Sequence, residues 1–127
     1  MAERPLEGLR GKLILVVEDD FIIATDLALA LEDCGAEVLG PAASVDDALE
    51  LIAAGHRLSG ALLDINLGQE LAYPIADELR RRGVPFIFAT GYDAWIIPDP
   101  YRNMPRCEKP VDTRIVERLL NEGNANA

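Results

Sequence analysis

The sequence has few of the residues that mark several common classes of protein. Its two cysteines, Cys34 and Cys107, fit no metal-binding spacing and are too few for a disulfide framework. We expect both to be reduced core residues of a cytoplasmic protein. The single histidine, His56, has no second imidazole for a metal cluster and is expected on a surface loop. No glycine-rich loop of the P-loop or dinucleotide type is present.

Long apolar runs and an excess of basic residues are also missing. No apolar stretch is long enough to cross a membrane, and Met1–Pro5 lacks the pattern of a signal peptide. Twelve basic residues face 22 acidic ones, for a net charge of −10. This charge disfavours nucleic acid and anionic membranes as partners, because basic residues drive binding to phosphates. The cluster Arg80–Arg82 suits the end of a helix, where positive charge is stabilising.

The hydrophobic pattern alternates between strands and helices. Apolar runs predict three buried strands, and two weaker stretches predict short ones. Asp20, Ser44 and Asp112 are suited to begin helices, as is Pro74 in a first turn. We therefore expect an α/β protein with a doubly wound, five-stranded parallel sheet and helices on both faces. The expected strands are Leu13–Val17, Glu37–Gly40, Gly60–Leu63, Val84–Ala89 and Arg106–Glu108.

The 127 residues fit one domain. We expect a loose N-terminal arm over residues 1–11, one domain over 12–121 and a polar tail over 122–127. The fourth helix is expected to be short or irregular, because Pro98 and Pro100 limit a helix that begins near Asp93 to about one turn. We therefore expect no separate DNA-binding or enzymatic domain in this chain.

Polar residues follow the expected strands where each strand ends. Because the carboxyl ends of parallel strands share one edge of the sheet, which is where ligands bind, we expect these residues to converge. The acidic pair is suited to Mg²⁺, with Asp19 as a direct ligand and Glu18 acting through water. The alternative for Asp19 is a helix cap. The converging residues are Glu18, Asp19, Asp64, Thr90 and Lys109.

Asp64 is the candidate nucleophile of this set. A carboxylate at a strand end can attack a phosphoryl group and form an acyl phosphate when a cation offsets the charge. The alternative is an aspartate that only turns the chain. Asn66 has a backbone carbonyl that can reach the metal, and the Thr90 hydroxyl and Lys109 ammonium can contact phosphoryl oxygens.

Together these motifs resemble the receiver domain of bacterial response regulators, over about Lys12 to Leu120. The resemblance rests on Val16–Asp20, Leu63-Asp64, Ala89-Thr90 and Lys109-Pro110 in that order. It implies a flavodoxin-like fold and phosphorylation of Asp64 by a histidine kinase or phosphotransfer protein. It further implies Mg²⁺ on Asp19, Asp64 and the Asn66 carbonyl, with Glu18 assisting, and phosphoryl contacts from Thr90 and Lys109.

The sequence departs from the common receiver pattern at one position of interest. Arg106 stands where an aromatic switch residue is usual, so the usual coupling of threonine to a buried ring cannot operate. The segment Phe88–Tyr92 resembles an atypical subgroup with a Phe-Ala-Thr-Gly signature, which pairs with histidine kinases of the HWE and HisKA-2 types. We expect Gly91, Tyr92 and Trp95, with Arg106, to form the responsive surface. The alternative for Trp95 is that it only fills the gap left by a short helix.

Two further functions use the same residues. A small phosphatase with an aspartyl nucleophile also needs Asp, Lys, Thr and Mg²⁺, but it places the nucleophile on the first strand of its domain. A degenerate receiver would bind a partner without phosphorylation. We favour a response regulator that signals by protein contacts with an unidentified downstream partner, and we expect a monomer or a weak homodimer.

Overall fold

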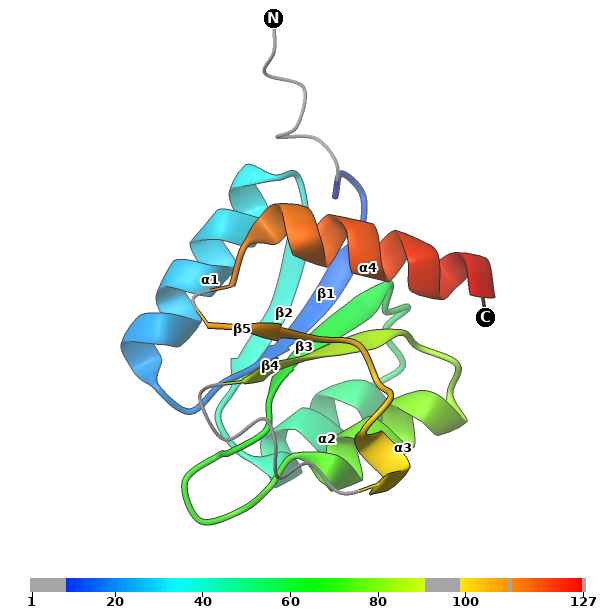
Figure 1. Ribbon diagram of the computed structural model, residues 1–127. Coiled ribbons are helices and arrows are strands. Elements are labelled where there is room, and N and C mark those ends of the chain that lie inside the picture. The colour runs from blue at the N-terminus through cyan, green and yellow to red at the C-terminus, as the bar shows by residue number, and fades with distance from the viewer. Residues whose placement is uncertain (1–8, 91–98, 110, 127) are drawn as a thin grey trace, which may run out of the picture.

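The computed structural model describes residues 9–90, 99–109 and 111–126. Its centre is a five-stranded parallel sheet in the order β2-β1-β3-β4-β5, which confirms the expected sheet (Figure 1). The strands are β1 (Leu13–Val17), β2 (Glu37–Ala42), β3 (Gly60–Asp64), β4 (Phe86–Thr90) and β5 (Arg106–Glu108).

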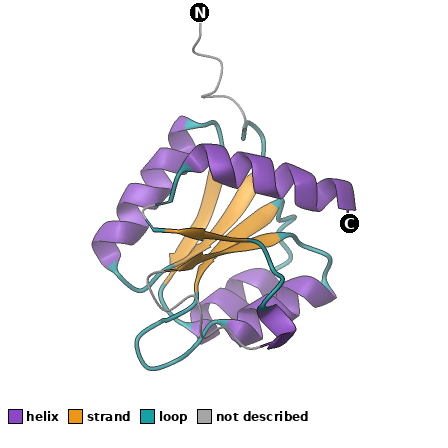
Figure 2. Ribbon diagram, viewed as in Figure 1, coloured by secondary structure: helices purple, strands orange, loops and turns teal. Residues whose placement is uncertain are grey.

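Helices cover both faces of the sheet, so the fold is doubly wound (Figure 2). The helices α1 (Phe21–Asp33) and α4 (Thr113–Asn126) lie on one face, and α2 (Val45–Ala53) and α3 (Tyr73–Arg81) on the other (Figure 1). Each face has its own buried apolar cluster. Leu31, Val116 and Leu120 pack against the first face, and Ile52, Ile75 and Leu79 against the second.

The helices begin where their capping residues predict. Asp20 Oδ1 accepts the backbone N–H groups of Ile22 and Ile23 at 2.9 and 3.0 Å. Ser44 Oγ accepts the N–H of Asp47 at 3.1 Å, and Asp112 Oδ1 accepts that of Arg114 at 2.9 Å. These side chains satisfy N–H groups that have no partner within their own helix.

Between β4 and β5 the structure describes a single turn of 3₁₀ helix, η3 (Asp99–Tyr101). This short element is in keeping with the irregular fourth helix expected from Pro98 and Pro100. The predicted turn that begins near Asp93 lies outside the described residues.

Several predicted boundaries differ from the structure. The strand β2 continues to Ala42 and not Gly40, and β4 runs over Phe86–Thr90 and not Val84–Ala89. Both ends of the predicted domain differ as well. Leu9 is fully buried and its N–H donates to the Cys34 carbonyl at 3.1 Å, so residues 9–11 pack against the domain and do not belong to an arm. The helix α4 continues to Asn126, through the predicted tail. Leu9 belongs to no periodic apolar pattern, so its burial could not be predicted from the sequence. The helix α4 continues because adding residues to an existing helix avoids the unfavourable nucleation step.

Three smaller expectations agree with the structure. Cys34 and Cys107 are buried, and His56 is exposed. Among the described residues, no helix is both long and apolar enough to cross a membrane.

Candidate functional site

The register of the sheet places predicted site residues of neighbouring strands side by side at its carboxyl edge. Val17 pairs with Leu63, so Glu18 and Asp64 follow at neighbouring positions at the carboxyl edge. Asp64 pairs in turn with Ala89. Side chains two residues apart on a strand point to the same face of a sheet. Glu18, Asp64 and Lys109 therefore lie on the face that α1 and α4 cover. The residues two positions earlier on that face belong to its buried apolar cluster; they are Val16, Leu62 and Cys107.

An ammonium group joins two buried carboxylates at this edge. Lys109 Nζ lies 2.9 Å from Glu18 Oε1 and 3.1 Å from Asp64 Oδ2. The Glu18 and Asp64 side chains are 3% and 10% exposed, against 23% for Lys109. Asp19 is exposed, and carboxylate oxygens of Glu18, Asp19 and Asp64 lie within 4.8 Å of one another. The structure therefore places the three predicted carboxylates and the lysine in one cluster.

Burial and charge act against each other in this cluster. Burial raises the pKa of Glu18, and the nearby Asp64 adds to this, although hydrogen bonds from Lys109 and from the Asp20 N–H oppose the rise. Burial acts to lower the pKa of Lys109, but its hydrogen bonds and attraction to Glu18 and Asp64 outweigh burial, so this pKa is raised. The ammonium form of Lys109 is thus stabilised beside the carboxylates.

The loop after β3 forms one side of the cluster. The Asn66 N–H donates to Asp64 Oδ1 at 3.2 Å, and Asn66 Oδ1 accepts the Gly68 N–H at 3.1 Å. Gly68 has a φ of +81°, and a Cβ there would lie 3.4 Å from Asp19 Oδ2. The backbone of this loop therefore lies close to both Asp64 and Asp19.

The donor set fits a divalent cation. Three carboxylate groups meet at this point, and Mg²⁺ prefers oxygen ligands. Three carboxylates and one ammonium leave a formal charge of −2, which one dication neutralises. The arrangement is thus suited to hold a metal ion beside the buried carboxylate of Asp64.

The remaining predicted residues are only partly described. Thr90 ends β4 and pairs with Glu108, directly before Lys109, but the position of its hydroxyl lies outside the described part of the chain. Arg106 is exposed on β5, and its Nη1 donates to the Arg102 carbonyl at 3.2 Å. Gly91, Tyr92 and Trp95 lie outside the described residues, so the responsive surface stays a prediction.

Sequence reasoning missed an aromatic cluster near the end of β4. Tyr73 and Tyr101 stack with ring centroids 4.3 Å apart, and Phe88 meets Tyr73 edge-on at 5.9 Å. The Tyr101 hydroxyl donates to Asp77 Oδ1 at 2.7 Å, and this hydrogen bond raises the pKa of Tyr101. The only signal in the sequence was a tyrosine beside a proline in each case, Tyr73 before Pro74 and Tyr101 after Pro100.

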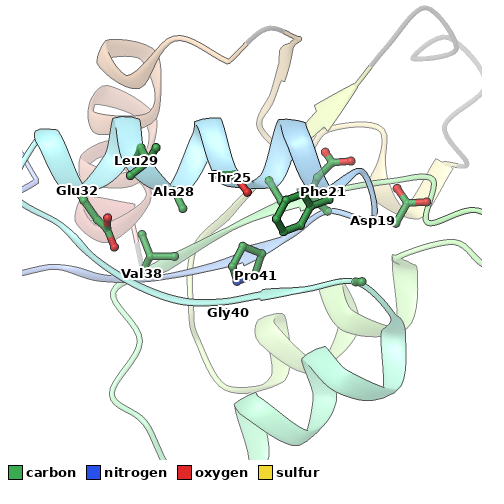
Figure 3. A pocket seen from close by; sticks show the side chains of 12 residues that line it. Asp19, Phe21, Thr25, Ala28, Leu29, Glu32, Val38, Gly40 and Pro41 are labelled. Atoms are coloured by element: carbon green, nitrogen blue, oxygen red, sulfur yellow. The ribbon is translucent and has the colours of Figure 1, made fainter.

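A shallow groove runs from the acidic cluster along α1 and β2. Asp19 lies at one end and Glu32 at the other, with small and apolar side chains between them (Figure 3). Phe21 is 81% exposed and Leu29 is 56% exposed along this groove. The groove thus combines exposed apolar side chains with an acidic residue at each end.

Comparisons with known proteins agree with this architecture. No family model matches the chain. It is 35% identical over 93 residues to the phyllosphere-induced regulator PhyR of Methylorubrum extorquens, covering 72% of this chain and 35% of PhyR. The chain thus spans about a third of the length of this curated relative. The solution structure of SdrG from Sphingomonas melonis is 33% identical with a TM-score of 0.77, covering 92% of this chain and 98% of SdrG.

A third comparison concerns the fold. The response regulator TrrA of Thermotoga maritima, solved in complex with Mg²⁺ and BeF, is 22% identical with a TM-score of 0.74. The match covers 88% of this chain and 98% of TrrA. At this identity the likeness shows the fold alone, a five-stranded parallel sheet covered by helices. The chain belongs to the response regulator receiver family.

Proposed function

We propose that this chain accepts a phosphoryl group on Asp64 in a Mg²⁺-dependent reaction and signals through protein contacts in a two-component phosphorelay. The observation that carries the proposal is the position of Lys109, whose ammonium contacts Asp64 Oδ2 at 3.1 Å beside Glu18 and Asp19. Asp64 can act as the nucleophile, and the Lys109 ammonium lies close enough to stabilise negative charge on a phosphoryl group bound to Asp64.

These contacts suit transfer of a phosphoryl group from a phosphohistidine. An Asp64 oxygen attacks phosphorus, a P–O bond forms, and the P–N bond breaks with its electron pair returning to the imidazole of the donor. The Lys109 ammonium then donates a hydrogen bond to a phosphoryl oxygen in place of one of its bonds to the carboxylates. We propose that the Thr90 hydroxyl donates to another phosphoryl oxygen. Mg²⁺ held by Asp19, Asp64 and the Asn66 carbonyl, with Glu18 through water, would supply positive charge that offsets the carboxylates and the phosphoryl group.

We further propose a histidine kinase of the HWE or HisKA-2 type, or a phosphotransfer protein, as the phosphodonor. The Phe88–Tyr92 signature supports this class. The exposed Phe21 and Ile22, 81% and 71% accessible at the start of α1, supply an apolar contact surface close to Asp19. Replacing Phe21 by Ser is expected to slow transfer from such a kinase several-fold, while labelling by acetyl phosphate stays unchanged. Equal losses with both donors would contradict this assignment of the surface.

Phosphorylation is tested with a small donor. Incubation with Mg²⁺ and acetyl phosphate is expected to add about 80 Da, the mass of one phosphoryl group. Asp64→Asn should abolish the gain, while Asp46→Asn, an exposed aspartate in the first turn of α2, should retain it. Failure of acetyl phosphate and of every kinase tried would contradict the proposal. Rapid multiple turnover of donor would favour a phosphatase.

A further inference from the structure

The loop between β3 and α3, residues 65–72, is attached to a distant helix by one side chain. Glu70 Oε2 accepts the backbone N–H of Val45, the first residue of α2, at 3.1 Å. Within the loop, the Leu67 N–H donates to the Glu70 carbonyl at 2.9 Å, and Leu67 is 5% exposed. Glu70 therefore joins the part of the loop that contains Asn66 to the amino end of α2.

A carboxylate is well suited to this position. The first N–H groups of a helix have no partner within the helix, and the amino end has a partial positive charge. Ser44 satisfies the Asp47 N–H of α2, and Glu70 satisfies the Val45 N–H. Two side chains thus cap the start of α2: Ser44, which directly precedes the helix, and Glu70 from the β3–α3 loop.

The same contacts connect the segments that border the acidic cluster. The Glu18 N–H donates to the Ala42 carbonyl at 2.9 Å, which ties the end of β1 to the end of β2 just before α2. Glu70 ties the start of α2 to the β3–α3 loop. The loop returns to Asp64 through the Asn66 N–H, and Gly68 lies against Asp19. Glu70 completes a ring of contacts around the candidate metal site.

We propose that Glu70 is a positioning residue for the metal site, holding the β3–α3 loop so that the Asn66 backbone faces the carboxylates. This inference rests on the proposed Mg²⁺-dependent function. Loss of the Glu70 carboxylate leaves the contacts inside the loop intact but removes its hydrogen bond to the start of α2. The loop then moves relative to Asp19, and the site loses part of its preorganisation.

The test compares Glu70→Ala and Glu70→Gln with Gln69→Ala, an exposed neighbour in the same loop. Mg²⁺ is titrated while the amide resonances of Asp64, Asn66 and Gly68 are followed by NMR. Glu70→Ala is expected to weaken Mg²⁺ binding by about 10-fold, the smallest effect typical of changes beyond the directly bound ligands. Glu70→Gln should lie between this variant and the wild type, and Gln69→Ala should match the wild type within about twofold.

A second measurement separates positioning from a purely structural role. Hydrogen exchange of the Val45 amide should accelerate in Glu70→Ala. Faster exchange with unchanged Mg²⁺ affinity would overturn the proposal, because the hydrogen bond would then stabilise only α2. If Glu70→Ala does not fold, Glu70→Gln alone decides by its Mg²⁺ affinity. Absence of Mg²⁺ binding by the wild type would overturn the proposed function as well, so the two failures are distinguishable.

Discussion

Replacing Lys109 by Met removes the cation that contacts two buried carboxylates. The ammonium lies 2.9 Å from Glu18 and 3.1 Å from Asp64, and methionine keeps a similar length without charge. The formal charge of the cluster then changes from −2 to −3, counting Glu18, Asp19 and Asp64 as ionised. We expect the variant to be less stable than the wild type without metal and to recover in Mg²⁺.

The magnitude follows from distance and burial. At an effective dielectric constant of about 20, each of the two contacts is worth about 5 to 6 kcal/mol before desolvation is subtracted. Breaking a fully buried pair costs about 3–5 kcal/mol, and breaking an exposed one about 0–1 kcal/mol. Because Lys109 is 23% exposed, we expect Lys109→Met to lower the free energy of unfolding by about 2–3 kcal/mol.

The assay is urea denaturation in EDTA and in Mg²⁺ at pH 7.5. A ligand at 100 times its dissociation constant stabilises the folded state by about 2.7 kcal/mol. Mg²⁺ should stabilise Lys109→Met more than the wild type, because no ammonium competes for the carboxylates, so the deficit should shrink to below about 1 kcal/mol. Lys12→Met, the same change just before the opposite end of β1, should stay within about 0.5 kcal/mol of the wild type in both conditions.

Two results would refute this reasoning. Equal stability of Lys109→Met and the wild type in EDTA would mean that solvent already screens the carboxylates. An equal deficit in EDTA and in Mg²⁺ would mean that Lys109 stabilises the fold by packing of its aliphatic chain and not by charge.

Three other predictions concern sites away from the cluster. Gly60→Ala should lower the free energy of unfolding, measured by urea denaturation, by about 1–3 kcal/mol, because its Cβ would lie 2.7 Å from the buried Leu120 Cδ2. An unchanged free energy of unfolding would show that Leu120 repacks freely. Glu78 should titrate by NMR near pH 2, since hydrogen bonds from Arg81 and Arg82 lower its pKa to about 2. The stabilisation of the fold by these ion pairs is complete above the ordinary pKa of 4.5 and is lost as the pH falls toward 2. A Glu78 midpoint near 4.5 would contradict these ion pairs. Burial raises the pKa of Cys107, so at pH 8 iodoacetamide should modify it far more slowly in the folded protein than in urea, and equal rates would show that the thiol is accessible.

Local patterns in the sequence determined the elements and their order. Continuous apolar runs such as Leu13–Val17 require a strand covered on both faces, and Asp20 and Ser44 can satisfy helix N–H groups wherever the helix packs. Alternation of strands and helices then requires parallel strands, whose carboxyl ends share one edge. For this reason the approach of Glu18, Asp19, Asp64 and Lys109 was predictable without coordinates.

Contacts between distant residues were decided only by the tertiary structure. The sequence suggested Lys109 as a phosphoryl contact, but the 91-residue separation from Glu18 hides their hydrogen bond. The link from Glu70 to Val45 and the burial of Leu9 are hidden in the same way. Periodicity and capping report how a residue interacts with its neighbours along the chain. Partners brought together by the sheet depend on register and on loop paths, which are set by the packing of the whole domain.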